Sequence, residues 1–278
     1  MIPFDFEYYR PDSIEEAVNV FERLDNEQKQ PIYLGGGSEI ITLGRLNQLQ
    51  TQAVIDLKRI PECKALQLEE GVLVLGAGLS LTEVAEANHF PLLTESAGRV
   101  ADHTARCTIT LGGNICSNLM YREAVLAFLV ADSQAVIAGK QGIRRVVFSD
   151  IYNKRLHLHR GEFLVQIATD TKLLTLPHRG VKKTKDSRIN YPLVSCAFLK
   201  CDGRLRLAVT GLCAFPFRMR EMEDCLNDDS LAPEERIKQC LRYLPAPIVD
   251  DVEGSAPYRQ FVFSNTLAEV IEQFEGRD

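Results

Sequence analysis

Two glycine-rich stretches carry the residues best suited to binding chemistry. The first, Tyr33–Ile40, runs from apolar residues into three consecutive glycines, then a serine and a glutamate. Glycine has no Cβ atom, so backbone N–H groups can form a concave anion site, and a helix beginning at Ser38 would add the positive end of its dipole. This stretch is a candidate diphosphate site. A tight turn that needs positive φ values explains the same glycines without a ligand, and on this stretch alone both interpretations stay open.

A second glycine stretch favours the ligand interpretation. Thr110–Asn114 again places paired glycines beside apolar and small polar residues. Two such turns can hold one extended ligand from two sides. We therefore expect the two stretches to converge in the fold and to bind the ligand through main-chain donors.

Local patterns predict the elements that position these turns. Serine and glutamate three residues apart predict helix starts at Ser13 and Ser80, and Asp202-Gly203 favours a type I′ hairpin turn. Apolar periodicity predicts helices at 14–24, 81–88, 121–130, 218–226, 233–243 and 255–274, a short one from Ser38 and one from Pro91. Strands are predicted at 4–8, 31–34, 53–57, 134–138, 143–148 and 162–167, with hairpins over 66–75 and 193–212.

Length and composition limit the class of protein. The chain has 278 residues, 45% hydrophobic and 25% charged, which is enough for several subdomains. The net charge of −6 argues against nucleic-acid binding. The acidic N-terminal residues and the lack of a run of ~18 apolar residues predict a cytoplasmic protein without signal peptide or membrane span. Eight scattered cysteines without a Cys-x-x-Cys pair indicate reduced, buried thiols rather than disulfides or an iron–sulfur site.

His157 and His159 alternate in sequence and are expected on one face of a strand. Such a pair can bind a metal, but no third ligand has suitable spacing, so a polar strand face is favoured. Nothing in the sequence indicates a catalytic triad or a cysteine nucleophile.

Together, the two glycine stretches resemble the FAD-binding signature of the flavoprotein (medium) subunits of molybdenum hydroxylases, the xanthine dehydrogenase and carbon monoxide dehydrogenase family. Gly36–Ile40 matches the first motif of that family and Thr110–Ile115 the second, in the same order and at a similar separation. The resemblance covers nearly the whole chain. It departs at Arg106-Cys107, where the family has Arg-Asn, and at Ile109, where the family has glycine.

The resemblance implies a set of residues that bind FAD non-covalently. Glu123 matches an aspartate that binds sugar hydroxyls, Leu164 an apolar residue against the flavin ring, and Lys182 a basic residue near the flavin edge. Each has a plain alternative: a solvated helix residue, a core residue, and a solvated basic loop in which Lys183 or Lys185 could substitute. The full set is Tyr33, Leu34, Gly35, Gly36, Gly37, Ser38, Glu39, Ile40, Thr110, Leu111, Gly112, Gly113, Asn114, Glu123, Leu164 and Lys182.

The resemblance also implies the architecture and the activity. It implies an α+β fold of the p-cresol methylhydroxylase type, with FAD-binding subdomains over 1–55 and 56–172, FAD between them, and a small C-terminal domain over 173–278. Electrons would pass from a molybdopterin subunit, through [2Fe-2S] clusters of an iron–sulfur subunit, to this FAD and then to NAD or another acceptor. Two rival classes are a stand-alone flavin oxidoreductase and a non-catalytic partner subunit without FAD.

Overall fold

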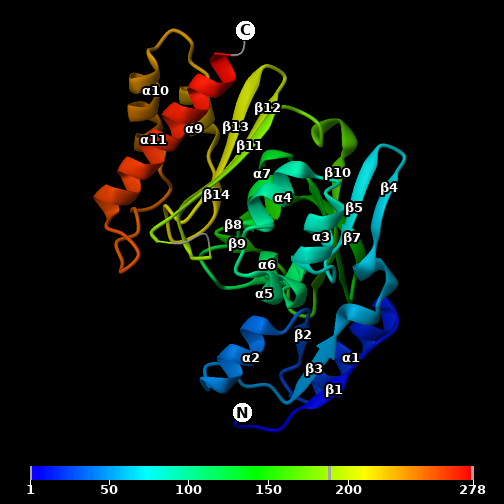
Figure 1. Ribbon diagram of the computed structural model, residues 1–278. Coiled ribbons are helices and arrows are strands. Elements are labelled where there is room, and N and C mark those ends of the chain that lie inside the picture. Colours follow the sequence, from blue (N-terminus) through cyan, green and yellow to red (C-terminus); the bar gives the residue numbers. More distant parts are fainter. Residues whose placement is uncertain (1, 187–188, 277–278) are drawn as a thin grey trace. The chain divides into compact units, whose positions relative to one another are not determined.

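The computed structural model describes residues 2–186 and 189–276, and Figure 1 shows its elements. The chain forms two compact units, each assembled from segments that are not consecutive. Unit 1 comprises Met1–Ala87, His103–Ser117 and Ser133–Thr171, and unit 2 comprises Asn88–Asp102, Asn118–Asp132 and Lys172–Asp278. The predicted division of the chain at residues 55 and 172 stays a prediction, and one unit boundary falls between Thr171 and Lys172.

Unit 1 begins with a small parallel sheet of strand order β1-β3-β2. Its strands are β1 (Glu7–Tyr9), β2 (Ile32–Leu34) and β3 (Ala53–Asp56), and its helices are α1 (Ile14–Asn26) and α2 (Ser38–Arg45). The register pairs Leu34 with Asp56, so the carboxyl ends of β2 and β3 lie side by side. The first glycine stretch leaves the sheet at this edge. As predicted, the Ser13 hydroxyl caps α1 by accepting the Glu16 N–H at 3.1 Å.

A five-stranded antiparallel sheet forms the rest of the framework of unit 1. Its order is β4-β5-β10-β6-β7, built from β4 (Leu66–Glu69), β5 (Val72–Gly76), β6 (Gln134–Gly139), β7 (Gly142–Val147) and β10 (Phe163–Asp170). The apolar face of α1 contributes Phe21 and Leu24 to one core with Ile55 of β3 and Phe163 of β10. Helix α1 therefore packs against strands of both sheets in this unit, as Figure 1 shows in blue and green.

Short elements complete unit 1 around the second glycine stretch. They are the 3₁₀ turns η1 (Leu57–Arg59) and η2 (Pro61–Lys64), the helices α3 (Leu81–Ala87), α5 (His103–Thr108), α6 (Leu111–Cys116) and α8 (Phe148–Ile151), and the strands β8 (Tyr152–Asn153) and β9 (Arg155–Leu156). The predicted capping box of α3 is confirmed in both directions, since the Glu83 N–H donates to Ser80 Oγ and the Ser80 N–H donates to the Glu83 carboxylate.

Unit 2 is a four-stranded sheet with helices on both faces. Its strands are β11 (His178–Thr184), β12 (Pro192–Cys201), β13 (Arg204–Thr210) and β14 (Phe217–Arg218). One face carries alternate residues such as Phe198 and Leu207 into a core with α9 (Arg220–Leu226), α10 (Pro233–Cys240) and α11 (Ala256–Glu275). The opposite face is covered by α4 (Pro91–Ala97) and α7 (Ala124–Val130). Figure 1 shows α9, α10 and α11 in orange to red beside the yellow strands.

Charged residues join the separate segments of unit 2. Asp132, which follows α7, pairs with Arg206 of β13 at 2.9 Å and with Arg218 of β14 at 2.7 Å. Arg218 also pairs with the buried Glu223 of α9 at 2.6 Å. Because Arg218 and Glu223 are both buried, each is needed to offset the desolvation of the other.

The predicted α+β class is confirmed, and most predicted elements appear within a few residues of their expected places. The hairpin turn carries φ values of 51° at Asp202 and 75° at Gly203, as a type I′ turn requires. One expectation is wrong, since His157 and His159 lie beyond the end of β9 rather than on a strand face. The alternative of a basic loop around Lys182 is also wrong, because that stretch is strand β11.

Two of the cysteines, Cys107 and Cys116, are exposed, so the expectation of buried thiols is wrong for these two. Within residues 2–186 and 189–276, every helix falls short of the length and apolar character needed to cross a bilayer.

Helix α11 offers a matched pair of substitutions for testing the core of unit 2. Phe263 is fully buried, whereas Phe261 is 61% exposed. We expect Phe263→Ala to lower the free energy of unfolding by about 3–5 kcal/mol, since it leaves a cavity between sheet and helices. Phe261→Ala should change it by less than about 0.5 kcal/mol. Urea denaturation of both variants measures this, and equal losses would contradict the assigned burial.

Candidate functional site

The two glycine stretches meet within unit 1. The Gly36 N–H donates to Thr110 Oγ1 at 3.3 Å. A Cβ atom added to Gly36 would lie 1.9 Å from the Thr108 carbonyl oxygen, and one added to Gly35 would lie 2.4 Å from Thr110 Oγ1. The predicted convergence is confirmed. The glycines are needed because the two backbones approach more closely than any side chain allows.

The Thr110 hydroxyl is the joint between the stretches. It accepts the Gly36 N–H from the first stretch and the Gly113 N–H, at 3.1 Å, from the second. The second bond caps α6, so the second glycine stretch is the first turn of a helix. Thr110 is only 3% exposed, so neither amide can readily exchange this acceptor for water.

The amides of the second stretch are engaged within the protein. The Leu111 N–H donates to the Leu79 carbonyl at 2.7 Å, the Gly112 N–H to the Ala77 carbonyl at 2.8 Å, and the Asn114 N–H to the Thr110 carbonyl at 2.9 Å. With the Gly113 bond to Thr110 Oγ1, all four N–H groups of 111–114 have internal acceptors. The expectation that both stretches supply main-chain donors is therefore revised, because the second one uses its donors to hold α6 in place.

The first stretch leads directly into α2. Gly37 has φ 79°, in the left-handed region, and precedes Ser38, the first residue of the helix. In the described part of the chain, no side chain caps α2. The first N–H groups of a helix have no intrahelical acceptor, and the helix dipole makes this end positive. The start of α2 can therefore receive an anion such as a diphosphate.

Lys58 is a site residue that the sequence analysis missed. Its Nζ atom donates to the Gly35 carbonyl at 2.8 Å and to Asp56 Oδ2 at 2.9 Å. Asp56 also accepts the Tyr8 hydroxyl at 2.5 Å. Asp56 ends a strand directly beside the end of β2, and polar residues at neighbouring carboxyl ends of parallel strands often line ligand sites. The position of Asp56 and Lys58 at the end of a predicted strand was the sequence signal that could have identified them as site residues.

Tyr33 turns its side chain away from the glycines. The ring stacks on Phe21, with centroids 4.9 Å apart, and its hydroxyl donates to the Gly161 carbonyl at 3.1 Å. Burial raises the pKa of Tyr33 well above its ordinary value. Leu164 is buried, in β10, where the pairing register shifts at a bulge next to Val165. The ring and the hydroxyl of Tyr33 are thus engaged within the protein.

Glu123 and Lys182 lie in unit 2 and bind each other. Lys182 Nζ is 3.0 Å from Glu123 Oε1 and 2.8 Å from the Arg99 carbonyl oxygen, and the two side chains are only 5% and 3% exposed. Burial raises the pKa of the Glu123 carboxyl, and the Lys182 ammonium opposes this rise. The alternatives of a solvated helix residue and a solvated loop are both wrong. The roles of Glu123 and Lys182 as FAD contacts stay predictions.

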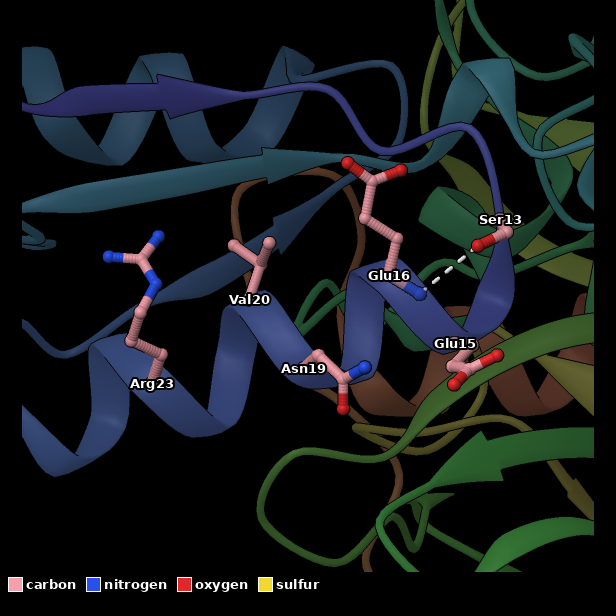
Figure 2. A pocket seen from close by; sticks show the side chains of 6 residues that line it. All are labelled: Ser13, Glu15, Glu16, Asn19, Val20 and Arg23. Atoms are coloured by element: carbon pink, nitrogen blue, oxygen red, sulfur yellow. Dashed lines mark hydrogen bonds between the residues drawn. The ribbon is translucent and has the colours of Figure 1, made fainter.

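A surface depression lies on α1 and its N-terminal cap. Figure 2 shows its lining side chains: Ser13, Glu15, Glu16, Asn19, Val20 and Arg23. They come from one helix and its cap, and two of them are acidic. With two carboxylates against the one guanidinium of Arg23, the lining has no excess of positive charge that would attract a diphosphate.

Comparison with protein families and curated proteins gives consistent matches. The model of a family described as the FAD binding domain in molybdopterin dehydrogenase matches residues 4–169. The carbon monoxide dehydrogenase medium chain of Hydrogenophaga pseudoflava is 31% identical over 151 residues, 52% of this chain and 51% of that protein. The nicotinate dehydrogenase FAD-subunit of Eubacterium barkeri is 23% identical over 293 residues, 98% of each chain.

Solved structures share the fold. Carbon monoxide dehydrogenase from Hydrogenophaga pseudoflava matches with a TM-score of 0.84 at 22% identity, over 97% of this chain and 96% of that chain. Quinoline 2-oxidoreductase from Pseudomonas putida 86 matches with a TM-score of 0.85 at 19% identity, over 98% and 97%.

The close approach of the two stretches predicts a selective effect of added methyl groups. Gly36→Ala should lower the free energy of unfolding by about 3 kcal/mol, because the new Cβ meets the Thr108 backbone, which has no rotamer to change. Gly44→Ala, within α2, is the control: its Cβ would meet nothing closer than 3.5 Å, and alanine is the better helix former, by about 1 kcal/mol. Urea denaturation compares them, and a stable Gly36→Ala variant would refute the described contact.

The buried pair in unit 2 predicts a pH-dependent defect. Lys182→Met should cost about 3–5 kcal/mol at neutral pH, because it leaves the Glu123 carboxylate buried and unpaired. Burial alone then raises the folded-state pKa of Glu123 further above its unfolded value. Such a group stabilises the fold at pH below the unfolded pKa, and this stabilisation is lost as the pH rises through the folded pKa. The defect should therefore be larger at pH 8 than at pH 5.

Lys183→Met is the matched control, since Lys183 pairs with Glu269 and both side chains are 40% or more exposed. We expect a loss below about 1 kcal/mol with little pH dependence. Thermal or urea unfolding of both variants between pH 5 and pH 8 measures these losses. A Lys182→Met defect that does not change with pH would show that Lys182 does not shift the pKa of Glu123, which would contradict the described ion pair.

Proposed function

Because the chain belongs to the family of FAD-binding domains of molybdopterin dehydrogenases, we propose that it is the electron-transferring flavin subunit of a heteromeric, xanthine dehydrogenase-like enzyme. The observation that carries the proposal is the uncapped start of α2, held against the second glycine stretch by the Thr110 hydroxyl. This arrangement suits the diphosphate of a dinucleotide.

The residues of the chain would bind and orient the cofactor. The main chain around Gly37 and Ser38 would hold the diphosphate, while Leu164, Glu123 and Lys182 remain candidates for the flavin and sugar parts. When bound, FAD supplies the redox chemistry, since its ring system carries one or two electrons. The protein then needs to contribute position and electrostatics rather than a general base.

We further propose that the partners are an iron–sulfur subunit and a molybdopterin subunit, in a cytoplasmic complex. Relatives named as a medium chain and as a FAD-subunit support a subunit role. Electrons from the substrate would reach this FAD through the [2Fe-2S] clusters of the partner and leave to NAD or another acceptor. The names of the relatives include carbon monoxide, nicotinate and glyceraldehyde dehydrogenases, so the substrate of the complex stays open.

One observation supports a second candidate, a partner subunit without FAD. The carboxylate expected to bind sugar hydroxyls, Glu123, is already bound to Lys182 in a buried pair. Binding a hydroxyl in its place would require that pair to rearrange. Flavin content separates this candidate from the first.

The proposal predicts the behaviour of the purified chain. It should bind FAD, show the visible absorption of an oxidised flavin, and oxidise neither purines nor carbon monoxide by itself. Activity should appear only when the chain is co-expressed with its molybdopterin and iron–sulfur partners. A chain that turns over substrate alone would favour a stand-alone flavin enzyme. A colourless chain that still assembles with those partners would favour the subunit without FAD.

A further inference from the structure

Lys58 places a positive charge at the first glycine stretch. Its Nζ atom is 2.8 Å from the Gly35 carbonyl oxygen and 2.9 Å from Asp56 Oδ2, and its side chain is 35% exposed. An ammonium group has three N–H bonds. Among the residues that the structure describes, nothing accepts the third, so it is available to an oxygen of a bound ligand.

The negative partner of Lys58 is buried beneath it. The side chain of Asp56 is only 5% exposed. It accepts the Tyr8 hydroxyl at 2.5 Å and the Lys58 backbone N–H at 2.9 Å, in addition to Lys58 Nζ. Burial opposes ionisation of Asp56, but these hydrogen bonds outweigh it and hold its pKa below the ordinary value. The pair thus presents its positive end to solvent and keeps its negative end covered.

Lys58 also helps to orient the first stretch. The peptide between Gly35 and Gly36 is held on both sides, its carbonyl by Lys58 Nζ and its N–H by Thr110 Oγ1. A peptide unit is planar, so these two bonds fix its orientation. The following residues, Gly37 and Ser38, then begin α2 in a fixed direction.

We propose that Lys58 is a specificity residue for the diphosphate of the cofactor, donating its third N–H to a phosphate oxygen. The ligand class is a dinucleotide diphosphate, and a flavin without phosphate would gain nothing from Lys58. Charge-assisted hydrogen bonds to phosphate are among the stronger polar contacts in proteins. This inference rests on the FAD-binding function proposed above.

The test is a titration of the flavin-stripped full chain with FAD and, separately, with riboflavin. Lys58→Met should weaken FAD binding about 10- to 100-fold and leave riboflavin binding unchanged. Lys58→Arg, which keeps the charge, should restore most of the FAD affinity. Inorganic diphosphate should compete with FAD in the wild type and compete poorly in Lys58→Met.

Lys64→Met is the matched control. Lys64 is 37% exposed, and its Nζ atom likewise donates to a glycine carbonyl, that of Gly78, and to a carboxylate, that of Glu83. The Lys64→Met variant should bind FAD with the affinity of the wild type. Asp56→Asn/Lys58→Met removes both charges, so it avoids an unpaired buried carboxylate and should show the same selective loss of FAD.

The outcomes separate the two proposals. If the wild type binds FAD and Lys58→Met binds it within twofold, the assignment of Lys58 is wrong and the proposed function stands. If the binding of FAD and the binding of riboflavin weaken in parallel in Lys58→Met and in Asp56→Asn/Lys58→Met, Lys58 acts on the fold and the specificity role is wrong. If the wild type binds no FAD, both proposals fail.

Discussion

The hydroxyl oxygen of Thr110 is the interaction on which the candidate site depends. It accepts one N–H from each glycine stretch, Gly36 and Gly113, and so joins parts of the chain that are 74 residues apart. The joint works only because Gly35 and Gly36 have no Cβ atoms, which would overlap Thr110 and Thr108. Removing the hydroxyl would leave two donors without acceptors at a buried position, and each such group costs about 1–3 kcal/mol.

The two glycine stretches have similar sequences but different tasks. In the second, every N–H group of 111–114 has an acceptor inside the protein, so the stretch is a supporting element. In the first, the start of α2 has no side-chain cap in the described structure, while Lys58 and Thr110 hold the preceding peptide. An anion site needs donors that stay unsatisfied until the ligand arrives and cannot turn to find other acceptors. The rigid second stretch provides that condition for the first.

The sequence predicts features that depend on neighbouring residues and misses those that depend on distant ones. The serine caps at Ser13 and Ser80 and the Asp202-Gly203 turn are local signals, and they are confirmed. Helix α6 was missed because paired glycines disfavour helix, and bonds to Ala77 and Leu79 compensate. The Lys182–Glu123 pair was missed because charged residues are expected in water, and only the fold brings a partner from 59 positions away.

Whether distant segments are joined by an ion pair or by a neutral hydrogen bond depends on the charge of the neighbouring site. In unit 2, ion pairs such as Lys182–Glu123 and Arg218–Asp132 join distant segments, and each buried charge depends on its partner. At the first glycine stretch the joint is a neutral hydroxyl. An aspartate could cap α6 as well as Thr110 does. Its carboxylate, however, would lie within hydrogen-bonding distance of Gly36 and repel a diphosphate at the start of α2. A threonine gives the same geometry without that charge, so the joint itself adds no carboxylate that would oppose an anion attracted by the helix dipole and Lys58.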